Sequence, residues 1–263
     1  MADLPHAART PLLEAIDLTS RVREDVLALD GVSLRVHPGE IYCLLGTAGA
    51  GKTTLLHAFL GLVQPSSGQA LVAGINAAQD PLAARRHITY VARGASLYES
   101  LTARQNIEFF VRVGGGGEGL TRHDYYNAMR RVGIPERAFE RPARELGRAL
   151  PLRLWLAIGT LKNTSVLLVD EPTVGLDLYA SADLQEALVE FRKRGKALLI
   201  TTIDVLHAGR IADRIGIMRE GRKLLELSQQ ELVGGTLHEL YLEYMGRPLP
   251  RLSAAVATAG GRS

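Results

Sequence analysis

The chain has 263 residues, of which 46% are hydrophobic and 22% are charged, and its formal net charge is +3. These values predict one large folded domain with a real core, and they exclude a chain too polar to bury one. The charge is too small to indicate a nucleic-acid partner by itself. We interpret the arginine-dense stretch between Arg122 and Arg153 as a solvated helical surface in preference to a binding patch.

Residues 1–11 predict a flexible leader without the pattern of a signal peptide. No apolar run is long enough to cross a bilayer. Cys43 is the only cysteine, so no disulfide can form within the chain, which fits a reducing compartment. It lies in an apolar run, and we interpret it as a small core residue rather than a nucleophile.

The first half of the chain predicts strands around a glycine loop. Short apolar runs separated by turns indicate strands between residues 12 and 36. Residues 41–45, "IYCLL", form a continuous apolar run that suits a strand buried on both faces. A glycine loop follows, then a helix from Lys52. Residues 64–74 predict a turn and an edge strand.

The second half predicts a helical insert and then a return to the sheet. The insert covers about residues 95–162 and is interrupted by a glycine-rich stretch. Beyond it, the strands "SVLLVD" and "KALLIT" alternate with helices over residues 180–194 and 205–213. This alternation predicts an α/β fold with a mostly parallel sheet.

The last predicted helix covers residues 236–245. Its apolar side chains fall on one face, which we expect to dock on the domain: Leu237, Leu240, Tyr241 and Tyr244. Residues 246–263 are rich in small residues and proline and predict a flexible tail.

Residues 46–54, "GTAGAGKTT", match the Walker A pattern and lie between a predicted buried strand and a predicted helix. Glycines in such a loop let backbone N–H groups turn toward phosphate oxygens, and the helix N-terminus adds partial positive charge. Lys52 supplies a full charge for the β- and γ-phosphates, and the Thr53 hydroxyl supplies a ligand for Mg²⁺. The predicted site for ATP and Mg²⁺ therefore comprises Gly46, Thr47, Ala48, Gly49, Ala50, Gly51, Lys52, Thr53 and Thr54.

Two carboxylates follow the apolar run at residues 166–169. Asp170 is the predicted second contact for Mg²⁺, made through water. Glu171 is the predicted catalytic group that orients and deprotonates the attacking water, alongside Lys52. An ordinary acidic pair at a strand end is the alternative, and the phosphate loop earlier in the chain disfavours it.

Over about residues 12–245, the chain resembles the nucleotide-binding subunits of ABC transporters. The resemblance rests on the Walker A loop, on "SSGQALVAG", on "LYESLTARQNIEFF" and on "EPTVGLD", where Asp177 stands at the family's D-loop aspartate. The stretch around "LTARQNIEFF" is most similar to ATPases paired with exporter permeases of the ABC-2 type. The resemblance implies a P-loop NTPase core with a mostly parallel sheet, an antiparallel β subdomain and a helical insert subdomain.

The resemblance also implies a function. Residues 12–245 would form an ABC-type ATP-binding domain that binds Mg-ATP, dimerises over two nucleotides and drives a separate membrane permease. The chain is then expected to be cytoplasmic and peripheral on the inner face of the cell membrane, through the permease, with no nucleic-acid partner. ABC proteins of translation or DNA repair fit less well, because they carry two such domains or long coiled coils.

Four positions depart from the family pattern. The signature turn falls at Leu146–Leu150, "LGRAL", where bulky side chains replace the small residues that let backbone touch phosphate. The Q-loop glutamine position falls near Arg93, and the switch histidine position falls at Ile203, which cannot make the same hydrogen bonds. The adenine-stacking aromatic is replaced near Val22, which offers an apolar contact only. His207 comes four residues too late to replace the histidine, and we interpret it as an ordinary helix residue.

These departures leave two functions open. In the first, the chain hydrolyses ATP slowly, since single lost groups at such sites cost orders of magnitude in rate. It then acts as a homodimer or as a heterodimer with another ABC ATPase. The heterodimer suits the altered signature turn better. In the second, it is an ATP-binding interaction or regulatory subunit with little hydrolysis, paired with an active paralogue. We favour the first.

Overall fold

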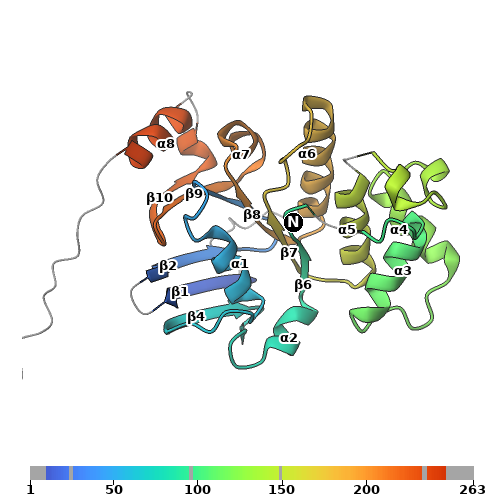
Figure 1. Ribbon diagram of the computed structural model, residues 1–263, viewed down its shortest axis with the longest axis horizontal. Coiled ribbons are helices and arrows are strands. Elements are labelled where there is room, and N and C mark those ends of the chain that lie inside the picture. The colour runs from blue at the N-terminus through green and yellow to red at the C-terminus, as the bar shows by residue number, and fades with distance from the viewer. Residues whose placement is uncertain (1–9, 24–25, 95–96, 148–149, 233–235, 247–263) are drawn as a thin grey trace, which may run out of the picture.

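The computed structural model describes residues 10–23, 26–94, 97–147, 150–232 and 236–246. Its strands form two sheets, and helices cover both faces of the larger one (Figure 1). Among the described residues, no helix combines the length and the apolar character that crossing a bilayer requires.

The smaller sheet has four antiparallel strands in the order β2-β1-β4-β5. Residues 67–72 lie between two partners, so they form an inner strand and not the edge strand expected from the sequence. Gly68 is required where this strand crosses its neighbour, because a Cβ there would lie 2.3 Å from the Asp17 carbonyl oxygen. The strands are β1 (Leu13–Arg23), β2 (Val26–Val36), β4 (Ser67–Val72) and β5 (Ile75–Asn76).

The larger sheet has six strands in the order β10-β9-β3-β8-β7-β6. Its strands pair in parallel except for β10, which is antiparallel to β9. Every residue of β3, β7 and β8 is buried, which explains their continuous apolar runs. The strands are β3 (Ile41–Leu45), β6 (Ile88–Val91), β7 (Val166–Asp170), β8 (Ala197–Thr202), β9 (Arg214–Arg219) and β10 (Arg222–Ser228).

Most helices outside the insert follow strands of the larger sheet, as the alternation predicts, whereas α2 (Pro81–Arg86) follows β5 of the smaller sheet. Aspartates cap three of them by accepting a hydrogen bond from the backbone three residues on: Asp80, Asp177 and Asp204. The helices are α1 (Lys52–Phe59), α2 (Pro81–Arg86), α6 (Leu178–Lys193), α7 (Val205–Ile211) and α8 (Thr236–Gly246), with a short 3₁₀ turn at Gln229–Leu232.

The helical insert lies at one end of the molecule (Figure 1). Its helices are α3 (Ala103–Val113), α4 (Arg122–Arg131) and α5 (Leu150–Leu161), with 3₁₀ turns at Glu136–Ala138 and Ala143–Glu145. Several of its arginines pair with glutamates of the same region: Arg104 and Arg122 with Glu140, Arg130 with Glu136, and Arg141 with Glu145. These charges are therefore neutralised locally.

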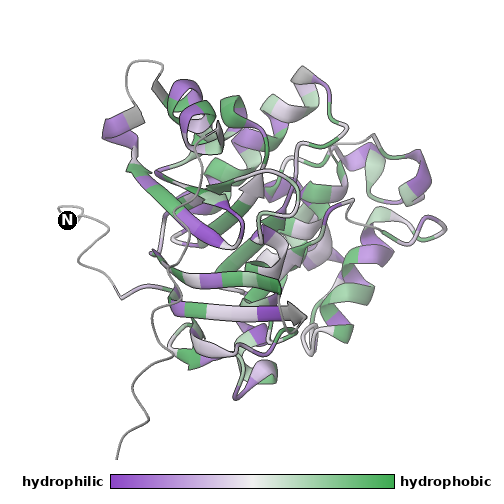
Figure 2. Cartoon of the chain, turned by 60° about the vertical axis from the view of Figure 1, so that its left-hand side comes forward, coloured by the Kyte–Doolittle hydropathy of each residue, from purple (hydrophilic) through white to green (hydrophobic). Residues whose placement is uncertain are grey.

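The core has two parts, one on each face of the larger sheet. Alternate residues of β3 divide between them: Cys43 packs toward the insert, α6 and α7, whereas Tyr42 packs toward the smaller sheet and α1. Figure 2 shows hydrophobic residues concentrated in the central strands. On α8, Leu237 is buried, and Leu240 and Tyr241 pack on the first part of the core, which confirms the expected docking for these three residues of the predicted face.

Candidate functional site

The phosphate loop, residues 46–51, connects β3 to α1 at the carboxyl ends of the parallel strands. Neighbouring strand ends hold it in place. The Gly46 amide donates to the Thr202 carbonyl at 3.3 Å, and the Gly221 amide donates to the Ala50 carbonyl at 3.0 Å. The loop conformation is therefore fixed by the sheet.

Two glycines of this loop are required by close backbone approach. A Cβ on Gly46 would lie 2.3 Å from the Met218 carbonyl oxygen. A Cβ on Gly51 would lie 2.3 Å from the Ala28 carbonyl oxygen, and Gly51 also has a φ of +100°. Gly49 has a φ of +81°, but no described atom lies within 4 Å of the Cβ position. Glycine therefore serves packing at Gly46 and Gly51, and backbone conformation at Gly49 and Gly51.

Lys52 opens α1, and its side chain is buried, being only 4% exposed. Its Nζ donates to the carbonyl oxygens of Gly46 at 2.6 Å and Thr47 at 3.1 Å. It also lies 3.1 Å from Oε1 of Glu171. The ammonium group is thus held under the loop, where a bound phosphate would compete with the carboxylate for it.

Asp170, the last residue of β7, lies beside Thr53. Its Oδ2 accepts from the Thr53 hydroxyl at 2.9 Å, and its Oδ1 accepts from the Thr201 hydroxyl at 2.5 Å. This set of hydroxyl and carboxylate oxygens fits Mg²⁺, which prefers oxygen ligands and keeps several waters. Within the described ranges, no group of three or more His, Cys, Asp or Glu side chains could hold a metal ion.

Glu171 is buried in a left-handed backbone conformation, with a φ of +51°. Its Oε2 accepts from the Ile203 amide at 3.0 Å, and its own amide donates to the Thr201 carbonyl at 2.9 Å. Its Oε1 lies 3.1 Å from Lys52 Nζ and 3.5 Å from Arg93 Nη2. A strained backbone held by several neighbours is typical of functional sites.

Two cavities border these groups. One, of about 350 Å³, is lined by Asp170 and Glu171 together with residues on either side of Arg93. The other, of about 200 Å³, is lined by loop residues 47–50 and by Met245 of α8. Both have room for several waters or for an anion.

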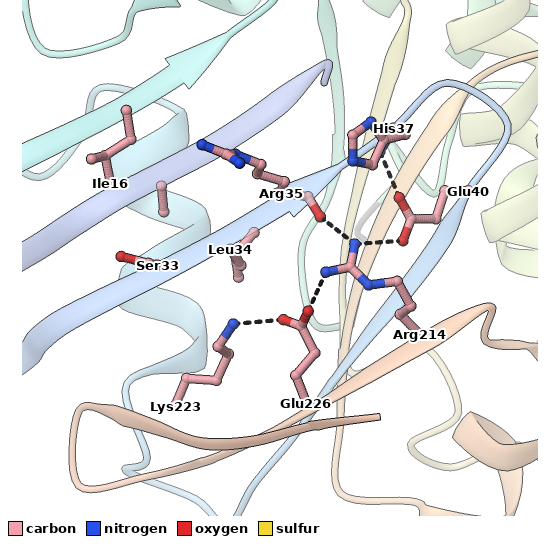
Figure 3. A pocket seen from close by; sticks show the side chains of 10 residues that line it. Ile16, Ser33, Leu34, Arg35, His37, Glu40, Arg214, Lys223 and Glu226 are labelled. Atoms are coloured by element: carbon pink, nitrogen blue, oxygen red, sulfur yellow. Dashed lines mark hydrogen bonds and ion pairs between the residues drawn. The ribbon is translucent and has the colours of Figure 1, made fainter. Parts of the chain in front are cut away.

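A third cavity, of about 630 Å³, lies apart from the phosphate loop, between the smaller sheet and β10 (Figure 3). Arg214 pairs there with Glu40 at 2.9 Å and with Glu226, and Lys223 pairs with Glu226 at 2.5 Å. Because these charges neutralise one another and join β9 to β10 and to Glu40, in the turn before β3, we assign them a structural role.

The structure brings together the predicted groups Lys52, Thr53, Asp170 and Glu171; their roles in binding and catalysis stay predictions. The side chain of Val22 and all of Arg148 and Ala149 lie outside the described residues. Leu146 and Leu150, on either side, pack partly buried on the core.

His207 does not reach the site. It is buried, and its Nδ1 lies 3.0 Å from the Gln185 side-chain amide. Burial lowers the pKa of the imidazole. The structure therefore agrees with the interpretation of His207 as an ordinary helix residue.

Sequence reasoning missed two features of the site. It treated Arg93 only as a lost glutamine, whereas Arg93 contacts Glu171. It also did not place the end of α8 beside the phosphate loop, where Arg219 Nη1 donates to the carbonyls of Tyr244 at 2.7 Å and Met245 at 2.9 Å. The charge of Arg93 was the available sequence signal for its contact with Glu171. No sequence signal was available for the position of the end of α8.

Comparison with known proteins gives the family. The protein-family model described as "ABC transporter" matches residues 29–174 of the chain. The daunorubicin resistance ATP-binding protein DrrA3 of Streptomyces coeruleorubidus is 33% identical over 89% of this chain and 73% of its own length. The Nod factor export ATP-binding protein I of Burkholderia thailandensis is 34% identical over 80% of this chain and 69% of its length.

One relative is much longer than this chain, and solved structures share the fold of this chain. The chain is 32% identical to ATP-binding cassette sub-family A member 7 of Rattus norvegicus but spans only 11% of its length. Among solved structures, cbiO1 from Clostridium perfringens has a TM-score of 0.76 and 26% identity, over 89% of this chain and 95% of that one. By its sequence, its fold and the residues gathered at the phosphate loop, the chain belongs to the ABC transporter family and has the fold of its ATP-binding cassettes.

Proposed function

We propose that this chain is a transport ATPase subunit that binds Mg-ATP, dimerises with a second ATP-binding chain and drives a separate membrane permease. The observation that best supports the proposal is the buried contact between Lys52 and Glu171, at 3.1 Å, beneath a phosphate loop that is hydrogen-bonded to neighbouring strand ends. A general base and a phosphate-binding cation placed side by side suit hydrolysis of a phosphoanhydride.

Each group has a distinct task. The amides of the loop and Lys52 bind and orient the phosphates, while Thr53 and Asp170 hold Mg²⁺ directly or through water. Held by these residues, Mg²⁺ would neutralise negative charge on the phosphates. Glu171 orients the attacking water and accepts its proton, and the Ile203 amide at 3.0 Å fixes the carboxylate for this task.

Exposed apolar residues near the site support dimerisation over nucleotide. They come after the ends of β7 and β8, and the predicted catalytic residue Glu171 also directly follows β7. The exposed apolar residues are Val174, Tyr179, Ile203 and Leu206. Tyr179 is 90% exposed. Large exposed apolar side chains on segments that follow these strand ends suit a surface that becomes covered. We propose that a second copy, or a related ATP-binding chain with an intact signature turn, covers it.

The helical insert offers a surface for the permease. Tyr98, Phe109 and Val113 are exposed, and the rings of Tyr98 and Phe109 lie 4.8 Å apart. Phe110 and Trp155 extend this aromatic cluster inward. An exposed aromatic cluster on an otherwise charged subdomain suits a protein partner. On this proposal, the chain acts at the inner face of the cell membrane through that partner.

The test is an ATPase assay on the purified chain, alone and with its partners. We expect Glu171→Gln to abolish turnover while Mg-ATP still binds, since the amide keeps the shape but cannot accept the proton. Glu190→Gln, on the exposed face of α6, is the matched control and should retain wild-type turnover. Turnover that Glu171→Gln leaves unchanged would remove Glu171 from the proposed role.

The second candidate, an ATP-binding regulatory subunit with little hydrolysis, is favoured by one observation. Glu171 is engaged by Lys52, Arg93 and the Ile203 amide at once, and Ile203 itself has no side-chain hydrogen-bonding group. Tight ATP binding with negligible turnover, even in the presence of an active paralogue and the permease, would favour this candidate over the first.

A further inference from the structure

Arg93 lies two residues after β6 and reaches across to the end of β7. Its Nη2 lies 3.5 Å from Oε1 of Glu171, the same oxygen that Lys52 Nζ approaches at 3.1 Å. The Arg93 side chain is 55% exposed, whereas those of Lys52 and Glu171 are almost wholly buried. A guanidinium group at the surface and an ammonium group in the interior therefore share one carboxylate oxygen.

This sharing leaves Arg93 poorly satisfied: among the described residues its guanidinium has this one ion pair, whereas Lys52 also donates to the Gly46 and Thr47 carbonyls. Although two cations lie within ion-pair distance, Glu171 Oε1 makes no hydrogen bond among the described residues. Asp170, the neighbouring carboxylate, is already engaged by the hydroxyls of Thr53 and Thr201. An anion with more oxygens than one carboxylate would give the Arg93 guanidinium an acceptor of its own beside Lys52.

A cavity lies beside this contact. The cavity of about 350 Å³ is lined by Ala92 and Gly94, on either side of Arg93, and by Glu171. Because Lys52 and Arg93 approach the same oxygen, an anion that takes the carboxylate's place beside Lys52 also comes within reach of Arg93. The carboxylate thus marks a position at which two cations of this chain converge.

The chemistry of the guanidinium group decides what it binds there. A cation cannot ligate Mg²⁺, so Arg93 cannot do the work of a glutamine at this position. A guanidinium fork is instead well matched to phosphate oxygens. Of the phosphates of ATP, the terminal one is closest to the water that Glu171 would orient.

We propose that Arg93 binds the terminal phosphate of ATP and makes the site discriminate ATP from ADP. The inference rests on the proposed function, because it assumes that Lys52 binds the β- and γ-phosphates. Arg93 is then a specificity-determining residue: it contributes to ATP binding, whereas ADP gives it nothing to bind.

The experiment measures Mg-ATP and Mg-ADP dissociation constants by calorimetry, with Glu171→Gln as background so that ATP persists. We expect Arg93→Ala to weaken ATP binding about tenfold to hundredfold, the range for a charge-assisted hydrogen bond, and to change ADP binding less than about twofold. Arg93→Gln should behave like Arg93→Ala, whereas Arg93→Lys should retain part of the discrimination.

Two further variants control the comparison. Arg112→Ala removes another exposed arginine, on α3, and should alter neither constant. Lys52→Ala should weaken binding of both nucleotides. Equal losses for ATP and ADP in Arg93→Ala and Arg93→Gln, or no loss for either, would overturn the inference while leaving the proposed function intact. Failure of the parent protein to bind either nucleotide would instead overturn the proposed function, and the inference with it.

Discussion

The buried pair of Lys52 and Glu171 should be energetically coupled even in the absence of nucleotide. Lys52→Met keeps the length of the side chain but removes the ammonium that Glu171 contacts at 3.1 Å. Arg93 and the Ile203 amide remain on the carboxylate. Removing one member of a buried pair costs about 3–5 kcal/mol, and we expect about 3 kcal/mol here, because part of the carboxylate's support survives.

The size of the coupling follows from distance and burial. Two unit charges at this separation attract by about 5 kcal/mol at an effective dielectric constant of about 20, and desolvation offsets part of that. Glu171→Gln alone leaves Lys52 without its carboxylate. The double variant Lys52→Met with Glu171→Gln has neither buried charge, so its loss of unfolding free energy should fall about 2 kcal/mol short of the sum of the single losses.

Urea unfolding followed by circular dichroism at pH 7, without nucleotide, measures these free energies. The control cycle uses Lys193 and Glu190 on α6, which lie closer together, at 2.6 Å, but are 60% and 57% exposed. Solvent screening should make their coupling clearly smaller than that of the buried pair. Equal coupling in the two cycles would refute the reasoning that burial, rather than distance, makes the contact under the phosphate loop strong.

Three further predictions concern the loop, the thiol and the imidazole. Gly51→Ala should lower both the free energy of unfolding and the nucleotide affinity by more than Gly49→Ala does. A Cβ at position 49 meets no described atom, so Gly49→Ala should cost only about 1–2 kcal/mol, for its positive φ. Urea midpoints compare the two stabilities, and calorimetry compares the two affinities. Cys43 is fully buried, which raises the pKa of its thiol, so a thiol reagent at pH 8 should leave the native protein unlabelled and modify the urea-unfolded chain; labelling of the native protein would contradict its burial. Burial lowers the pKa of His207 below its ordinary 6.5, so its neutral form favours folding above that pH and the benefit is lost as the pH falls; urea midpoints between pH 7 and 5 should decline more for the wild type than for His207→Gln.

The sequence predicted best those elements whose local pattern and tertiary environment agree. Strands β3, β7 and β8 are buried on both faces, so their apolar runs leave no ambiguity about burial. The helices predicted over residues 180–194 and 205–213 correspond to α6 and α7, and in the structure Asp177 and Asp204 cap their first turns.

What the sequence did not predict depends on contacts between distant segments. Arg93 meets Glu171 only because β6 pairs with β7, a pairing that no local pattern encodes. The position of β4 between β1 and β5 likewise follows from strand order. Conversely, the phosphate loop was predictable because its glycines, Lys52 and Thr53 are consecutive in the chain and act through short-range geometry.

The end of α8 beside the phosphate loop has a practical consequence. Met245 lines the cavity next to the loop. Arg219, the last residue of β9, holds the end of the helix there by donating to the carbonyls of Tyr244 and Met245. Because Cys43, the chain's sole thiol, is enclosed in the interior, Met245→Cys would be the single site open to an environment-sensitive dye. Fluorescence from that position would register occupancy of the loop in real time, without altering any group assigned to the chemistry.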